Sequence, residues 1–214
     1  MGERPRVLIV GPLPPPMGGV QLMIDMQLHS GLAREFELSA VDTSKRQLRW
    51  AVESPTWKTP FYFLRDFSRL VRSLAGFRPQ VVLVHAAPSP SLLRDWVFML
   101  VSRLAGAKVI CHYHGTMHTK FPSGETRGGR AIGRFLMGAA HQVIVLGPTY
   151  QREIGAAWHR TLAWAPNVCD VDSFLERPAE RPDWLWQGGD PVLFVGRLSA
   201  PKGLYDLVGA IPMV

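Results

Sequence analysis

The chain has 214 residues, of which 47% are hydrophobic and 19% charged, which is enough to bury the core of one domain and by length allows a second. Its net charge of +7 favours an anionic partner, for which a nucleotide, an anionic membrane surface and a nucleic acid are all candidates. The two cysteines lie far apart without CxxC or zinc-ligand spacing, which argues against a disulfide scaffold and a zinc-finger protein. No apolar run approaches the ~18 residues of a spanning helix, which argues against a membrane-spanning protein.

Aliphatic runs alternate with helical patterns along the first 165 residues. Arg6–Val10 has no polar alternation, which is typical of a strand buried on both faces of a parallel sheet. Further strands are expected at Phe36–Val41, Gln80–His85, Ala107–Tyr113, Gln142–Leu146 and Thr161–Ala165, and helices at Val20–Leu32, Phe61–Leu74, Leu92–Leu104, Arg134–Ala140 and Pro148–Trp158. This alternation predicts right-handed crossovers and a Rossmann-like, doubly wound parallel sheet of the α/β class.

The second long helix has two distinct faces in this interpretation. Its apolar face is assigned to Phe61, Leu64, Phe67, Val71 and Leu74. Arg65, Arg69 and Arg72 share the opposite face, either as an ordinary solvated surface or as a basic surface that rests on anionic lipid. Val7–Val10 is too short for a signal peptide, so we expect a cytoplasmic protein, either free or peripheral at the inner face of the membrane.

The C-terminal part has the composition of a linker followed by a new domain. The segment after Thr161–Ala165 is rich in proline and glycine, and Val192–Gly203 reads as a strand, a tight loop and the start of a helix. We therefore predict an N-terminal domain at residues 1–166, a linker at 167–190 and the truncated start of a C-terminal domain at 191–214. The polar segment Thr116–Gly129 is expected to be a long mobile loop.

Ligands of open α/β sheets bind beyond the carboxyl ends of the strands, so the residues that follow strands are the candidates. Gly18 and Gly19, before the first helix, could bring bare amides close to a ligand, or could form a plain turn. Arg197 and Lys202, which follow Gly196, could both reach one diphosphate, or could be ordinary surface cations.

Three histidines, His112, His114 and His118, gather around the end of one strand. His114 is nearest the mouth of the sheet and suits hydrogen bonding or proton transfer to a hydroxyl, whereas a buried structural histidine is the alternative. A metal site is a weaker alternative because no carboxylate lies at ligand spacing. Asp170-Val171-Asp172 resembles a metal motif but falls in the linker. The motifs of dinucleotide dehydrogenases, P-loop proteins, hydrolases and zinc proteases are missing.

Taken in order, the motifs resemble the group 4 retaining glycosyltransferases of the GT-B fold, which transfer sugars from nucleotide-sugar donors. The matching segments are the Pro-rich loop with Gly18-Gly19-Val20, His114-Gly115, Pro166 to Phe174, and Val195-Gly196-Arg197-Leu198 leading to Lys202-Gly203. Two features depart from that family: Asn167-Val168-Cys169-Asp170 stands where the family usually has Asn-Gly-Val-Asp, and the paired glutamates and nucleotide pocket would lie beyond Val214.

The resemblance implies roles for individual residues. Arg197 and Lys202 would stabilise the leaving nucleoside diphosphate, Gly18 and Gly19 would lie against the donor, and His114 would face the transferred sugar or the acceptor. The donor would be a UDP- or GDP-sugar and the acceptor a glycan, a lipid or a small molecule, without a metal ion, a tightly bound cofactor or nucleic acid. Activity of the fragment alone is not expected. The alternatives are a nucleotide-sugar epimerase of related fold and a non-catalytic binding module.

Overall fold

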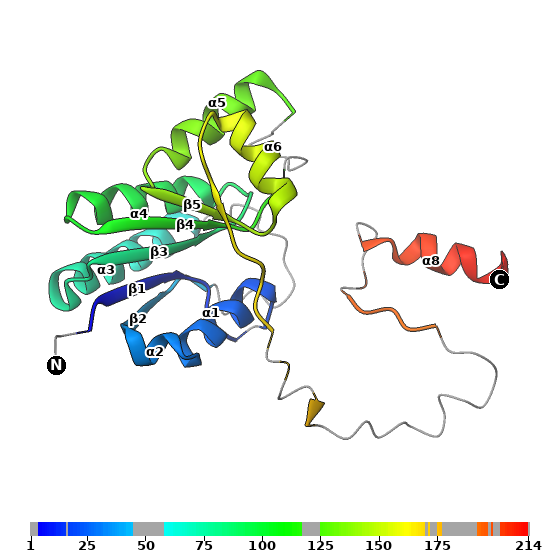
Figure 1. Ribbon diagram of the computed structural model, residues 1–214, viewed down its shortest axis with the longest axis horizontal. Helices are drawn as coiled ribbons and strands as arrows, with labels where there is room; N and C mark the ends of the chain where they lie inside the picture. The colour runs from blue at the N-terminus through cyan, green and yellow to red at the C-terminus, as the bar shows by residue number, and fades with distance from the viewer. Residues whose placement is uncertain are drawn as a thin grey trace. The chain divides into compact units, whose positions relative to one another are not determined.

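The computed structural model of the chain describes residues 4–15, 17–44, 58–116, 125–169, 171, 175–176, 192–196, 198 and 202–213 (Figure 1). The chain divides into two compact units, residues 1–170 and 171–214, and each is described by itself.

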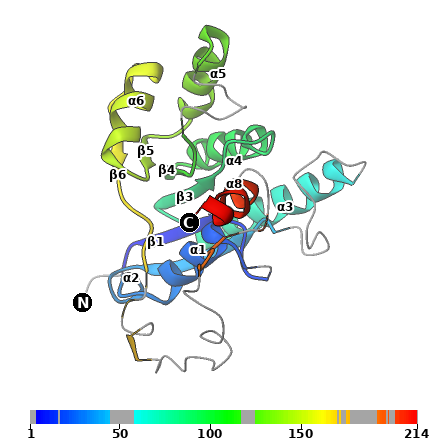
Figure 2. The same ribbon diagram turned by 90° about the vertical axis from the view of Figure 1, so that its right-hand side faces the viewer.

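The first unit is built on a six-stranded, entirely parallel sheet with the order β2-β1-β3-β4-β5-β6 (Figures 1 and 2). The strands are β1 (Arg6–Gly11), β2 (Glu37–Asp42), β3 (Val81–Ala86), β4 (Lys108–Tyr113), β5 (Gln142–Val145) and β6 (Ala163–Trp164). The strand β2 lies on one side of β1, and β3 to β6 are added in sequence order on its other side. This is the Rossmann-like arrangement that the alternating pattern predicts. The predicted α/β fold is therefore confirmed.

Helices connect all of these strands. They are α1 (Gly19–His29), α2 (Leu32–Glu35), α3 (Thr59–Phe77), α4 (Leu92–Leu104), α5 (Arg127–Met137) and α6 (Pro148–Trp158). Two differ from the sequence prediction. The single helix expected at Val20–Leu32 is interrupted at Ser30, whose hydroxyl donates to Gln27 O at 2.9 Å and accepts from Leu32 N at 3.2 Å.

The helix α5 begins at Arg127, well before the predicted start at Arg134. Thr126 adopts an extended backbone at the N-cap, and its hydroxyl accepts a hydrogen bond from the Gly129 amide at 3.0 Å. Such a cap satisfies one of the amides that a first helical turn leaves without a partner. Gly128 and Gly129 therefore belong to a capped helix, and the predicted end of the loop at Gly129 was wrong, because the helix begins at Arg127.

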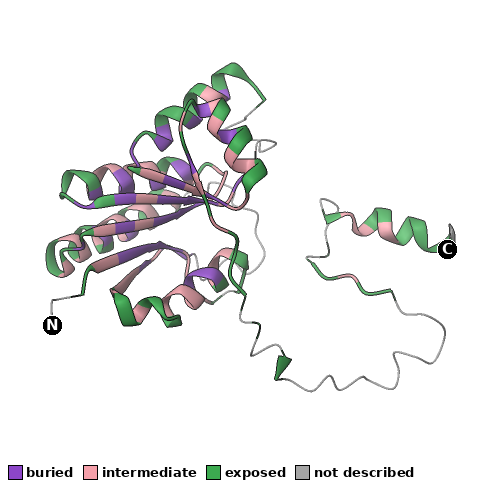
Figure 3. Ribbon diagram, in the orientation of Figure 1, coloured by how far each residue is buried: buried purple, intermediate pink, exposed green. Residues whose placement is uncertain are grey.

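The main core lies on the face of the sheet that α3 and α4 cover. Val84 and Cys111 of the central strands are fully buried there, together with Leu70 of α3 and Phe98 of α4. The other face is covered by α1, whose Ile24 is also fully buried. Figure 3 shows the buried residues concentrated along the strands and on the inward sides of these helices. Burial on both faces explains why the strands are continuous aliphatic runs.

The inward face of α3 differs from the predicted one. Phe67 and Leu74 pack against the core as predicted, whereas Phe61, Leu64 and Val71 are exposed to 70%, 63% and 41%. The residues that pack against the core or lie in it are Phe63, Phe67, Leu70, Leu74 and Phe77. This helix carries apolar residues on two neighbouring stripes, so spacing alone could not choose between them. Stacking of Phe63 on Phe67 and on Phe98 of α4 decides the orientation.

The second unit holds α8 (Leu204–Ala210) and a short 3-10 turn, η3 (Ile211–Met213). The helix begins after Gly203, which has a φ of 74° and so adopts the left-handed conformation that favours glycine. The predicted helix after Lys202 is confirmed, but the predicted strand at Val192–Val195 was wrong, since these residues form no strand. Val192, Leu193 and Val195 are 64–85% exposed, and a strand needs a neighbour to pair with.

Within the part of the chain that the structure describes, no helix has both the length and the apolar character needed to cross a bilayer.

Candidate active site at the carboxyl ends of β3 and β4

Three histidines lie together where β3 and β4 end. His85 and His112 are direct neighbours in the parallel register, and His114 follows two residues after His112. Side chains two residues apart along an extended chain point to the same face, so all three imidazoles lie on one side of the sheet. The ring centroids are 5.3 Å apart for His85 and His112, 5.2 Å for His85 and His114, and 4.6 Å for His112 and His114.

A hydrogen-bonded chain connects this cluster to α1. His85 Nε2 lies 3.0 Å from Gln27 Oε1, and His85 Nδ1 lies 2.9 Å from His114 Nε2. The amide oxygen of Gln27 can only accept, so His85 Nε2 is the donor, and a neutral His85 then offers Nδ1 as an acceptor. His114 Nε2 must therefore carry its ring proton, which leaves His114 Nδ1 with a free lone pair.

Burial keeps these imidazoles neutral. Desolvation lowers the pKa of His112 to about 4. The pKa of His114 is lowered to about 4, first by desolvation and then by the charge of His112. Desolvation, followed by the charges of His114 and His112, holds the pKa of His85 well below its ordinary value. Around pH 7 the cluster can therefore accept and relay hydrogen bonds without carrying a charge.

Two glycines make room for the cluster. A Cβ at Gly11, at the end of β1, would lie 3.1 Å from His85 Cβ and 2.5 Å from Ile24 Cδ1, so a larger residue there would displace one of these side chains. A Cβ at Gly115 would run into the ring of Tyr113, so the turn that follows His114 also depends on a missing side chain. The backbone amide of His114 is fixed by a 2.8 Å hydrogen bond to Ala86 O.

The two glycines at the start of α1 differ in their surroundings, because a Cβ at Gly18 would lie 2.6 Å from Gln21 Oε1. Gly18 is the N-cap residue, and its carbonyl accepts from Leu22 N at 2.9 Å, whereas a Cβ at Gly19 would meet nothing within 4 Å. The same helix carries Gln27, which bonds to His85. One element therefore links the predicted glycine site to the predicted histidine site.

Three other predicted site residues, Gly196, Arg197 and Lys202, belong to the second unit. Gly196 and Lys202 are exposed, whereas Arg197, like His118 of the first unit, lies outside the described residues. The joint binding of a diphosphate by Arg197 and Lys202 therefore stays a prediction.

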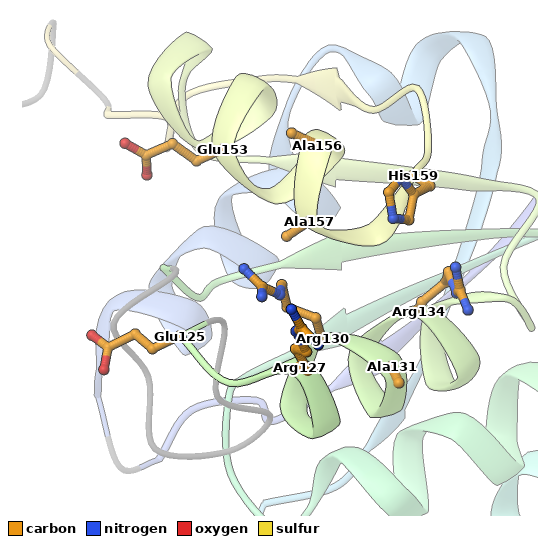
Figure 4. Close-up of a pocket in the computed structure, with 9 residues that line it drawn as sticks. All are labelled: Glu125, Arg127, Arg130, Ala131, Arg134, Glu153, Ala156, Ala157 and His159. Atoms are coloured by element: carbon orange, nitrogen blue, oxygen red, sulfur yellow. The ribbon is translucent and has the colours of Figure 1, made fainter.

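A second polar feature lies between α5 and α6. This pocket has a volume of about 740 Å³ and is lined by Glu125, Arg127, Arg130, Ala131, Arg134, Glu153, Ala156, Ala157 and His159. Figure 4 shows the two carboxylates at one end of the pocket and Arg134 with His159 at the other. None of the predicted site residues is among them. Mixed charges and an open, exposed position make this a weaker candidate for catalysis than the histidine cluster.

Sequence reasoning did not identify His85 or Gln27. The sequence does contain a feature that points to His85, since this histidine lies near the end of an otherwise aliphatic strand. In the parallel register it is the direct neighbour of His112 on the next strand. Gln27 had no such signal, because a glutamine on an amphipathic helix is usually a surface residue.

Comparison with known proteins points to one family. A family model described as a glycosyl transferase 4-like domain matches residues 7–161. No curated protein matches the chain. Among solved structures, a conserved protein from Enterococcus faecalis V583 is similar, with 11% identity over 81% of this chain and 97% of that chain and a TM-score of 0.31, too low to carry any argument. The family match covers the three histidines and the strands from β1 to β5, apart from the first residue of β1, and the chain belongs to the glycosyl transferase 4-like domain family.

Proposed function

We propose that this chain is the acceptor-side part of a retaining glycosyltransferase that uses a nucleotide-sugar donor. The family match supports the class of enzyme. The observation that carries the proposal is the neutral chain from Gln27 through His85 to His114, which presents a lone pair at the mouth of a parallel sheet. A lone pair fixed in this way is suited to accept a hydrogen bond from a hydroxyl group of the transferred sugar or the acceptor.

In the proposed reaction, negative charge develops on the leaving nucleoside diphosphate as the glycosidic bond breaks. Arg197 supplies a planar fork and Lys202 a point charge to that diphosphate, and Gly196, which precedes Arg197 in the sequence, lies close to it. Gly18 and Gly19 lie against the donor, where the open space above Gly19 leaves room for close approach. These cations replace a divalent metal at the diphosphate, and the donor is a UDP- or GDP-sugar. We also propose that residues 167–190 act as the linker between the two domains.

The charge pattern of α3 suggested that its arginines rest on anionic lipid, but we propose that its exposed apolar residues contact the membrane instead. Its arginines serve the fold, since Arg65 Nη2 donates to Ser44 O at 3.1 Å and Arg69 Nη1 to Asp42 O at 3.2 Å. Phe61 and Leu64 are the exposed apolar residues of this helix. We propose that these two side chains, within a basic chain, contact the cytoplasmic face of an anionic membrane and bring the enzyme to a lipid-linked acceptor.

The function is tested by transfer assays with labelled UDP- and GDP-sugars on the full-length protein. We expect His114→Ala and Lys202→Ala each to lower kcat by about 100-fold, the usual cost of removing one positioned hydrogen-bonding or charged group that acts on the transition state. His29→Ala, an exposed change on α1, is the matched control. Full transfer by His114→Ala with an unchanged pH profile would contradict the role of His114. Conversion of the donor without an acceptor would indicate an epimerase instead.

A further inference from the structure

The histidine cluster has the dimensions of a metal site. One nitrogen from each of His85, His112 and His114 can be chosen so that all three lie within 4.8 Å of one another. Tetrahedral zinc binds imidazole nitrogens at about 2.0–2.1 Å, which places them about 3.4 Å apart. His85 Nδ1 and His114 Nε2 are already 2.9 Å apart. Small rotations of the three rings therefore suffice to surround one ion.

One ring nitrogen of the cluster lacks the partner that a metal ion would provide. His112 is 2% exposed, and among the described residues its Nε2 has no hydrogen-bond partner. A buried polar nitrogen without a partner costs free energy, and coordination of an ion would remove that cost.

Gln27 supplies the outer contact that metal-binding histidines usually have. Such a histidine typically donates its second ring N–H to a carbonyl or carboxylate, which fixes the ring and its tautomer. His85 Nε2 lies 3.0 Å from Gln27 Oε1, and His85 Nδ1 is left facing His114. This orientation turns the lone pair of His85 toward the centre of the cluster.

We propose that His85, His112 and His114 bind a divalent transition-metal ion, with Zn²⁺ as the best match to three imidazole ligands. The ion takes the place of the single proton between His85 and His114. His114 stays neutral, because its proton moves from Nε2 to Nδ1 as Nε2 becomes a ligand. Three nitrogen ligands leave one tetrahedral position for water or another small ligand.

This site has a consequence for catalysis that rests on the proposed function. With the ion bound, His114 Nδ1 becomes an N–H donor and no longer accepts a hydrogen bond from a sugar hydroxyl. Zn²⁺ is therefore expected to suppress transfer, whereas the reaction itself proceeds without it. Binding of the ion does not depend on whether the protein is a transferase, so the two proposals fail separately.

The test is Zn²⁺ binding to the tag-free protein in competition with a chromophoric chelator. We expect a single site in the unmodified protein. His85→Gln and His112→Gln should each weaken it by more than about 100-fold, and Gln27→Leu by about tenfold, because loss of an outer hydrogen-bond partner costs roughly 10- to 100-fold. His29→Gln and Cys169→Ser change exposed candidate ligands and should leave the affinity unchanged.

A second measurement needs no variant. In the unmodified protein, ¹⁵N NMR of the histidine rings should show the proton of His114 on Nε2 without metal and on Nδ1 with Zn²⁺, and Co²⁺ should give the visible absorption of a tetrahedral site. The proposal is overturned if the ring signals of the three histidines do not respond to Zn²⁺. It is equally overturned if Cys169→Ser abolishes binding and His85→Gln does not.

Discussion

His112 shows how one buried side chain makes the stability of the protein depend on pH. Its pKa is about 4 in the folded protein, against about 6.5 in an unfolded chain. Between these values the unfolded state binds more protons, so the free energy of unfolding rises with pH from about 4 to about 6.5 and falls on acidification. His114 acts in the same direction. Each contributes up to about 1.4 kcal/mol per pH unit in this window.

We therefore expect urea unfolding of the protein to show a steep loss of stability as the pH is lowered from 6.5 to 4. His112→Gln should make that slope shallower by about one proton, whereas the exposed change His29→Gln should leave it unaltered. The comparison isolates the histidine from Asp66, whose pKa is raised by burial and which titrates in the opposite sense. If the unmodified protein, His112→Gln and His29→Gln lost stability with pH at the same rate, His112 would be accessible to protons in the folded state.

At the scale of elements, α5 and α6 meet through a glycine. A Cβ at Gly133 of α5 would overlap the indole ring of Trp158, a buried residue at the end of α6. The indole in turn packs edge-on against Tyr113 at the end of β4, with ring centroids 5.3 Å apart. Close approach of these two helices therefore helps to fix the strand end that leads into His114.

We expect Gly133→Ala to lower the free energy of unfolding by about 1–3 kcal/mol, because the added methyl group overpacks this contact. Gly128→Ala is the matched control on the same helix, since a Cβ there meets nothing within 4 Å. It should raise stability by about 0.5–1 kcal/mol through helix propensity. Urea denaturation of both variants checks the pair, and a stabilising Gly133→Ala would show that the helices are not in close contact.

At the scale of the whole molecule, the proposed membrane contact combines the net charge of +7 with the exposed apolar residues of α3. Vesicle sedimentation should show binding that increases with the fraction of anionic lipid and decreases with salt. Phe61→Ser should weaken binding by about 10- to 100-fold, because a Phe side chain contributes roughly 1.5–3 kcal/mol on burial. Leu104→Ser, at the exposed end of α4, is the control and should have no effect. Vesicle binding that does not change with the fraction of anionic lipid would contradict this proposal.

The sequence by itself determined the order and type of the elements in the first unit. Aliphatic runs such as Arg6–Val10 are typical of strands buried on both faces, and their alternation with helices predicts a parallel sheet, which the structure has. It also pointed to His114, because residues that follow such strands line the binding edge of the sheet. These are local or periodic properties, which a single sequence records directly.

Only the tertiary structure decided which residues meet. It turned Phe63 of α3 inward beside the predicted Phe67 and left Phe61 and Leu64 exposed. Stacking of Phe63 on Phe67 and on Phe98 outweighs the ambiguous spacing of the apolar residues. It brought His85, 29 residues before His114 in the chain, to within a hydrogen bond of that ring. Contacts between distant residues depend on strand register and helix packing, and a single sequence does not contain these. The sequence pattern thus determines where the site lies, at the carboxyl ends of the strands. The parallel register of β3 and β4 determines its chemistry, because it places His85 beside His112 and His114.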